Sequence, residues 1–232
     1  MAGTCHLVTG IARHAAVFRP QQQSIPTRSG ESILRSYLLL CLALLLPLSA
    51  QGGIMQHKAY HTGEPVPNKP MIMREFVEMQ HARKVAKVTF ADLQGNPKTL
   101  AEYQGRMVLL NLWASWCPPC LREMPALAKL RSKLQGSSIQ IVPLSIDEDP
   151  AAVAPFLAKH ELKLDDSWID SKKEIEKIMP ANVVPATYVF DPNGNLVGFI
   201  RGYLDWDDPD IADYLLRFAA KYQTLAQSKA KQ

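Results

Sequence analysis

Cys117 and Cys120 are the residues of this sequence best suited to chemistry. They are separated by Pro118 and Pro119 and preceded by Trp116. Two thiols three residues apart on a first helical turn lie within reach of one disulfide bond. Such a pair exchanges electrons with another disulfide through a mixed-disulfide intermediate. The spacing therefore predicts thiol–disulfide exchange.

A zinc site is the main structural alternative for a Cys-x-x-Cys pair. Zinc needs four ligands, so a second pair of Cys or His would have to complete the site. The other cysteines, Cys5 and Cys41, belong to the N-terminal region. The histidines beyond that region show no ligand spacing: His57, His61, His81 and His160. We therefore favour a redox pair and expect no metal and no other cofactor.

The position of Cys117 in the chain strengthens this interpretation. The run Met107–Trp113 is almost wholly apolar, as in a strand buried on both faces, and Pro118–Leu134 has the apolar spacing of a helix. Cys117 thus stands at a helix N-terminus, where a partial positive charge of about +0.5 stabilises a thiolate. We predict that Cys117 attacks the substrate disulfide and that Cys120 resolves the mixed disulfide.

The two intervening prolines bear on the direction of the exchange. Neither Pro118 nor Pro119 has an N–H to donate, and no histidine stands between the cysteines. The pKa of the Cys117 thiol should therefore fall less than in strongly oxidising pairs. This favours a reducing pair.

Alternating strands and helices follow along the chain, which predicts a central sheet covered on both faces. The expected strands are Lys87–Ala91, Met107–Trp113, Ile139–Ile146, Ala186–Phe190 and Leu196–Ile200. The expected helices are Pro118–Leu134, Ala151–His160, Ser171–Met179 and one from Pro209 to about Gln223.

Residues 1–50 have the layout of an export signal. The apolar run Tyr37–Leu48 follows Arg35 and precedes small residues, with cleavage expected near Ala50 or Gly52. Twelve helical residues span about 18 Å, short of a hydrocarbon core of about 30 Å. An uncleaved N-terminal membrane anchor is the alternative. Residues 51–83 are predicted to be a linker with a short helix over Met71–Ala82.

Charge excludes a nucleic-acid partner. The net charge is +4, but residues 1–50 hold four arginines against the single acid Glu31. The rest of the chain is close to neutral, with no basic stripe of the kind that nucleic-acid binding requires.

Several motifs together resemble the TlpA/ResA-type branch of the thioredoxin superfamily, which comprises exported thiol–disulfide oxidoreductases. The matching segments are Asn111–Cys120, Glu123-Met124-Pro125, Ser145-Ile146-Asp147 and Val184–Tyr188. The resemblance covers about Val85–Tyr222. It implies an α/β thioredoxin fold over residues 84–224, with a mixed central sheet and an extra β-α insertion after the active-site helix. Residues 225–232 are expected to form a disordered tail.

The resemblance also implies roles for single residues. Pro185 matches the family's cis-proline beside the disulfide, and the Val184 backbone would pair with an extended substrate segment. Trp116, Pro118 and Pro119 would complete the substrate-binding surface.

Asn111 stands where ordinary thioredoxins keep a buried aspartate, and an amide cannot accept that proton. Glu123 is the candidate replacement, with a pKa raised by burial so that it can take the proton of Cys120. The alternative is a surface glutamate paired with Arg122 or Lys129. Trp206 has two interpretations, as a partner-docking residue or as packing at the start of the last helix.

The resemblance implies a periplasmic disulfide reductase. Its substrates would be apocytochrome c or copper-site proteins of cytochrome oxidase, and a membrane protein would supply its electrons. Two alternatives stay open: a disulfide-forming oxidase, and a copper-binding assembly protein holding Cu(I) through Cys117 and Cys120. Such a protein usually has a third ligand in a downstream histidine near the pair, and His160 is the only histidine after Cys120. A peroxidase is disfavoured because peroxidatic cysteines occupy a different loop motif.

Overall fold

The computed structural model describes residues 57–230. The predicted signal or anchor over residues 1–50, with Cys5 and Cys41, lies outside the described residues. Within residues 57–230, no helix has the length and apolar character that a membrane crossing needs.

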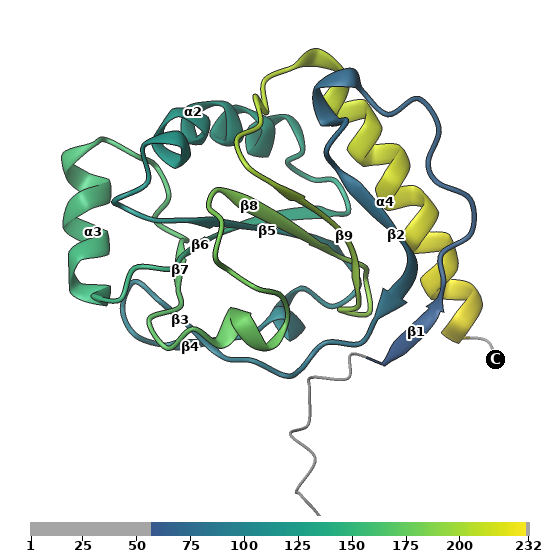
Figure 1. Cartoon of the computed structure of the whole chain (residues 1–232), viewed down its shortest axis with the longest axis horizontal. Coiled ribbons are helices and arrows are strands. Elements are labelled where there is room, and N and C mark those ends of the chain that lie inside the picture. Colours follow the sequence, from purple (N-terminus) through teal and green to yellow (C-terminus); the bar gives the residue numbers. More distant parts are fainter. Residues whose placement is uncertain (1–56, 231–232) are drawn as a thin grey trace, which may run out of the picture. The chain divides into compact units, whose positions relative to one another are not determined.

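A mixed sheet of nine strands forms the centre of the described domain, in the order β1-β2-β9-β8-β5-β6-β7-β3-β4 (Figure 1). The strands are β1 (Lys58–His61), β2 (Val77–Arg83), β3 (Phe90–Asp92), β4 (Pro97–Lys98), β5 (Met107–Trp113), β6 (Ile139–Ser145), β7 (Trp168–Ile169), β8 (Ala186–Phe190) and β9 (Leu196–Arg201). β5 runs parallel to β6, and β6 runs parallel to β7. The other pairings are antiparallel.

Helices and short 3-10 turns cover this sheet. They are η1 (Met71–Met73), η2 (Leu100–Tyr103), α2 (Pro118–Lys133), α3 (Pro150–Lys159), η3 (Glu174–Lys177) and α4 (Pro209–Ala230). Figure 1 shows α3 and α4 at opposite ends of the sheet, with α2 between them. This is the predicted thioredoxin-type α/β architecture, with α3 and β7 inserted between β6 and β8.

Strand β5 is the core of the sheet, and all of its residues are buried. Its side chains alternate between two faces, as the pleat requires. Leu109 belongs to a cluster with Leu127 of α2 and Phe218 of α4. Leu110 belongs to a second cluster that includes Ile175 of η3. Because both faces are covered, the near-continuous apolar sequence of β5 is satisfied.

The prediction of a linker with a short helix over residues 51–83 is wrong for the part that the structure describes. A 3-10 turn at Met71–Met73 leads into β2, which pairs with β9 and with β1. The buried residues Met79 and Ala82 fit a helix or a strand on sequence alone. The free edge of β9 decides for the strand, because it offers a ladder of backbone hydrogen bonds that a local pattern does not reveal.

Three further boundaries differ from the sequence-based expectation. The strand expected over Lys87–Ala91 is the shorter β3 at Phe90–Asp92. The predicted helix Ser171–Met179 is reduced to the 3-10 turn η3, because Lys173 is left-handed (φ 57°) and the Asp170 carboxylate accepts the Glu174 and Ile175 amides. The predicted disordered tail over 225–232 is also wrong up to Ala230, where α4 ends. No Gly or Pro interrupts this stretch, and Leu225 packs against the core.

A buried ionic contact joins β2 to the last helix. The Glu78 side chain is 7% exposed and accepts hydrogen bonds from the Val66 amide (2.8 Å), the Tyr222 hydroxyl (3.0 Å) and Lys221 Nζ (2.5 Å). Burial, and then the charge of Glu78, raises the pKa of Tyr222. Lys221 also donates to the Glu64 carbonyl (2.6 Å). This network fastens the N-terminal strands to α4.

We predict that Glu78→Ala lowers the free energy of unfolding by about 3 kcal/mol, because it leaves the Tyr222 hydroxyl and the Val66 amide without their acceptor and removes the ion-pair partner of Lys221. Urea unfolding measures this change. The matched control is Glu75→Ala, whose side chain is 72% exposed and should contribute less than about 0.5 kcal/mol. Equal effects of the two substitutions would contradict the importance of the network.

Candidate active site

The two cysteines lie where β5 gives way to α2. Cys117 and Cys120 form a disulfide with their Cα atoms 5.3 Å apart. Cys117 is the N-cap residue of α2, and its Sγ accepts a hydrogen bond from the Cys120 amide (3.2 Å). Both cysteines are buried, with Cys117 3% and Cys120 0% exposed. The pair is therefore held rigidly at a helix N-terminus, as the sequence predicts.

The cis-proline segment lies beside the disulfide. The Val184–Pro185 peptide bond is cis, which confirms the predicted geometry. Val184 packs against the hydrophobic cluster that contains both cysteines. The Pro185 carbonyl accepts from the Gly202 amide (2.8 Å), whereas neither backbone group of Val184 bonds to any residue in the described range. The free N–H and C=O of Val184 are available to an extended partner segment.

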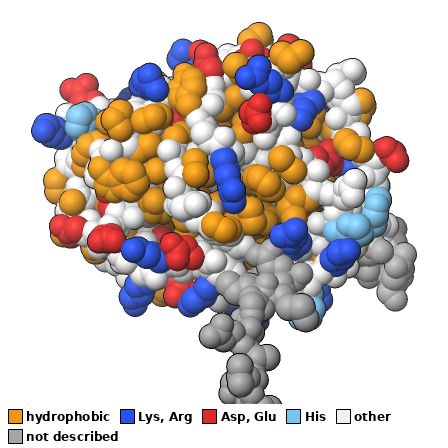
Figure 2. Space-filling model, viewed as in Figure 1, with side chains coloured by type: hydrophobic (Ala, Val, Ile, Leu, Met, Phe, Trp, Pro, Cys, Tyr) orange, Lys and Arg blue, Asp and Glu red, His pale blue; other side chains and the backbone are white. Residues whose placement is uncertain are grey.

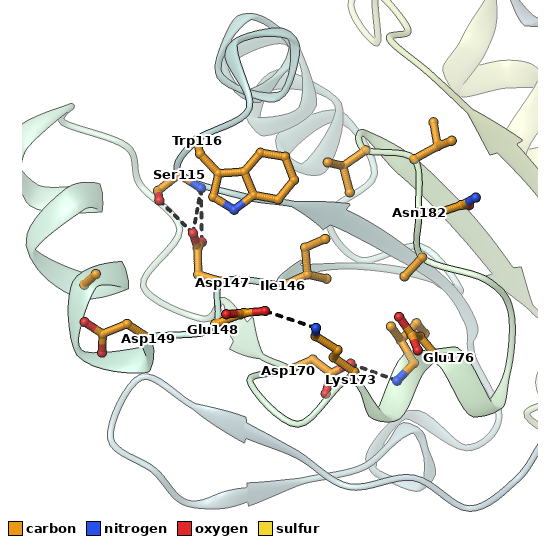
Figure 3. Close-up of a pocket in the computed structure, with 15 residues that line it drawn as sticks. Ser115, Trp116, Ile146, Asp147, Glu148, Asp149, Asp170, Lys173, Glu176 and Asn182 are labelled. Carbon is orange, nitrogen blue, oxygen red and sulfur yellow. Dashed lines mark hydrogen bonds and ion pairs between the residues drawn. The ribbon is translucent and has the colours of Figure 1, made fainter. Parts of the chain in front are cut away.

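A groove of about 880 Å³ opens next to the site, between Trp116 and the segment that leads to the cis-proline (Figure 3). Trp116 is 63% exposed and Val183 is 41% exposed. Glu148, Asp149 and Glu176 are among the acidic residues that line it. Figure 2 shows apolar side chains gathered over the centre of the face that it presents, with charged side chains mostly toward the margins. An extended polypeptide with apolar side chains fits such a surface.

Pro118 and Pro119 occupy the first two positions of α2. Pro118 is exposed and Pro119 is partly exposed. Because proline lacks an N–H, neither residue bonds to Cys117 Sγ. Within the described residues, the Cys120 amide is the one hydrogen-bond donor to that sulfur.

Glu123 lies one turn after Cys120 on the buried face of α2 and is 1% exposed. Its Oε1 accepts from Asn111 Nδ2 (2.9 Å), and its Oε2 accepts from the Leu204 amide (3.3 Å). Burial raises the pKa of Glu123 from about 4.5 to about 7, and these two hydrogen bonds partly oppose the rise. A carboxyl group with a pKa near neutrality is suited to accepting the proton of a thiol.

The surroundings of Glu123 decide between the two interpretations of this residue. The surface alternative is wrong, since Lys129 pairs with Asp207 (2.6 Å) and Arg122 lies over the ring of Tyr203 (5.5 Å). Trp206 is 2% exposed, so it packs in the core and is not a docking residue. Its indole N–H lowers the pKa of Glu123 slightly, because it stabilises the carboxylate form. This N–H makes no hydrogen bond of regular geometry with any described residue.

Several residues around the site carried no individual prediction. The hydroxyl of Thr187 accepts a hydrogen bond from Asn111 Nδ2 (3.1 Å), and the two residues are 76 positions apart. The backbone amide of Leu204 donates to Glu123, which is 81 positions away. No local pattern signals such contacts. Asp147 is different, because the motif Ser145-Ile146-Asp147 could have been recognised as polar residues following a buried strand.

No metal site is formed by the residues that the structure describes. No group of three His, Cys, Asp or Glu side chains in residues 57–230 could hold an ion. His160, the only histidine after Cys120 in the sequence, is the C-cap residue of α3, and its ring centroid lies 4.4 Å from that of Phe156. The arrangement supports exchange chemistry at Cys117 and Cys120 with Glu123 as the proton acceptor.

We predict that the oxidised protein loses stability between about pH 4.5 and pH 7 through Glu123. The unfolded chain releases this proton near 4.5 and the folded chain near 7, so the folded state binds more protons within this window. The free energy of unfolding should fall by on the order of 3 kcal/mol as pH rises from about 4.5 to about 7. Urea unfolding at pH 5 and pH 8 measures it. Glu123→Gln should remove this part of the pH dependence, and parallel curves for the two proteins would contradict it.

Comparison with known proteins gives consistent matches. The family described as AhpC/TSA matches residues 81–198, half of the chain. The chain is 28% identical over 168 residues to the thiol-disulfide oxidoreductase ResA of Bacillus cereus strain ATCC 10987, covering 72% of this chain and 90% of that protein. It is 30% identical over 125 residues to ResA of a second Bacillus cereus strain, covering 54% of this chain and 72% of that one.

Solved structures show the same fold. A secreted thiol-disulfide isomerase from Corynebacterium glutamicum superposes with a TM-score of 0.52 at 18% identity, covering 70% of this chain and 99% of that one. A DsbF homologue from Corynebacterium diphtheriae gives a TM-score of 0.51 at 22% identity, covering 65% and 99%. At these identities the likeness concerns the fold alone.

Proposed function

We propose that this chain, which belongs to the AhpC/TSA family and is a thiol–disulfide oxidoreductase, works as a reductase of protein disulfides outside the cytoplasm. The single observation that carries the direction is the sparse hydrogen bonding of Cys117 Sγ. Among the described residues it accepts only from the Cys120 amide, because Pro118 and Pro119 take the first two helical positions. A thiolate with few donors is stabilised weakly, and this favours the disulfide form of the pair over the dithiol.

The reaction would proceed in two exchanges. The Cys117 thiolate attacks one sulfur of the substrate disulfide, and the other substrate sulfur leaves as a thiolate. Cys120 then gives its proton to the Glu123 carboxylate and attacks Cys117 Sγ. The first substrate sulfur is released as a second thiolate. The substrate has gained two electrons, and Cys117 and Cys120 are left as a disulfide.

The substrate would bind as an extended segment. The free backbone groups of Val184 support pairing with such a segment, and the groove beside Trp116 supports contact with its side chains. Apocytochrome c and copper-site proteins of cytochrome oxidase are the substrates that the family resemblance favours. The reductase role requires a donor that reduces the Cys117–Cys120 disulfide again, for which we propose a membrane protein.

The N-terminal sequence and the chemistry together support a location outside the cytoplasm. The apolar run Tyr37–Leu48 behind Arg35 supports export to the periplasm, with or without retention at the membrane. A reductase acting on selected disulfides has a use in an oxidising compartment, where disulfides form and persist.

The reduction potential of the Cys117–Cys120 pair tests the proposed direction. Equilibration of the full chain with glutathione or dithiothreitol should give a potential near that of thioredoxin, about −270 mV. A value near about −120 mV, as in strong oxidants of this fold, would instead establish disulfide formation as the function.

The assigned roles of the two cysteines predict different behaviour for their variants. Cys120→Ser should accumulate a mixed disulfide between Cys117 and a substrate, because the resolving thiol is absent. Cys117→Ser should trap nothing, because Cys120 is fully buried. Non-reducing electrophoresis of an exported-protein extract measures both. Trapping by Cys117→Ser alone would reverse the assignment.

A further inference from the structure

Asp147 is a buried acid beside the redox site, 5% exposed, in the loop after β6. Its carboxylate accepts hydrogen bonds from the Ser115 amide (3.0 and 3.2 Å to its two oxygens), from Ser115 Oγ (2.7 Å) and from Ser145 Oγ (2.7 Å). Figure 3 shows Asp147 pointing at Ser115, next to Trp116. These hydrogen-bond partners are all neutral donors. Hydrogen bonds to an ionised carboxylate are stronger than those between neutral groups, so they tie Asp147 firmly to Ser115 and Ser145.

The parallel pairing of β5 with β6 places this carboxylate. Two parallel neighbours end at the same edge of a sheet, and here Trp113 lies opposite Ser145. The Ile146 amide donates to the Trp113 carbonyl (2.9 Å), which extends the contact by one residue. Asp147 therefore meets Ser115 directly, in the loop that leads to the cysteines.

Ser115 is the middle of a tight turn. The Cys117 amide donates to the Ala114 carbonyl (3.1 Å), which closes the turn Ala114–Cys117. β5 holds one end of this turn and α2 holds the other. Trp116 is 63% exposed and lies between Ser115 and Cys117, so its place at the groove depends on the turn.

We infer that Asp147 is a positioning residue for thiol–disulfide exchange: its buried carboxylate fixes the turn Ala114–Cys117 and thereby the place of Cys117 Sγ and Trp116 beside the groove. The inference rests on the proposed function only for its activity readout. It assigns no proton or electron to Asp147, which acts through Ser115. Misplacement of a reacting atom by about 1 Å can cost two orders of magnitude in rate.

The test compares Asp147→Ala with Asp147→Asn in the full chain. Both variants lack the same negative charge, but asparagine keeps an oxygen that can accept from Ser115. The first readout is alkylation of Cys117 by iodoacetamide in the reduced protein, which needs no disulfide substrate. We expect it to be about fivefold slower in Asp147→Ala than in Asp147→Asn, because only the alanine variant frees the turn. Equal rates would overturn the inference.

Hydrogen exchange separates positioning from a loss of overall stability. In Asp147→Ala the Ser115 amide should exchange at least about tenfold faster than in the native chain, while the Leu110 amide at the centre of β5 stays protected. Loss of protection at both amides would make Asp147 a merely structural residue. Should Asp147→Ala fail to fold, Ser115→Ala replaces it, since it removes one donor and keeps the charge. Unchanged alkylation in that variant would also contradict the inference.

Activity completes the test. With insulin as the disulfide substrate, kcat/KM should fall about tenfold in Asp147→Ala and recover partly in Asp147→Asn. The matched control is Asp213→Ala, an exposed aspartate on α4, which should leave kcat/KM unchanged. If the native chain reduces no disulfide while Asp147→Ala and Asp147→Asn still differ in their alkylation rates, the proposed function is wrong and the positioning role stands. Full insulin activity in a folded Asp147→Ala would overturn the positioning role.

Discussion

The parallel pairing of β5 and β6 is the interaction on which the redox site depends. It aligns seven residues of each strand, from Met107 opposite Ile139 to Trp113 opposite Ser145. Both strands therefore end at one edge, and the loops that follow them lie together. One loop carries Cys117 and the other carries Asp147. A parallel pair requires a crossover connection, and α2 supplies it while presenting both cysteines on its first turn.

Burial also tunes the acidity of one residue beside the disulfide, because it raises the pKa of Glu123 to about 7. The environment of Glu123 is built from distant parts of the chain: Asn111 on β5, and Leu204 and Trp206 on the segment before α4. A dry environment raises its pKa toward neutrality, and this also disfavours the ionised folded protein above pH 7. The raised pKa of Glu123 therefore lowers the stability of the folded protein at neutral pH, and the proposed function would use it for proton transfer. Such conflicts between packing and polarity are expected at functional sites.

The N-terminal strands close the end of the sheet that the chemistry does not use. β2 covers the edge of β9, and Glu78 ties β2 to α4 through Lys221 and Tyr222. The sheet then ends at the four-residue strand β1, and a short edge strand is one way in which proteins limit pairing with other chains. At the redox site, by contrast, the backbone of Val184 keeps free hydrogen-bonding groups within the described fold. The proposed pairing with an extended substrate would use these groups.

The amino-acid sequence by itself determined the features that depend on residues close together in the chain. The Cys-Pro-Pro-Cys spacing, the apolar run of β5 and the helix start at Pro118 each depend on neighbouring residues, so pattern reasoning predicted them. The cis-proline and the burial of Glu123 were expected from family motifs, and the structure has both. Tertiary structure alone decided that residues 77–83 form a strand, since the edge of β9 selects it, and that Asp147 meets Ser115. Contacts between residues 32 or 81 positions apart have no local signal, because register and crossover geometry create them.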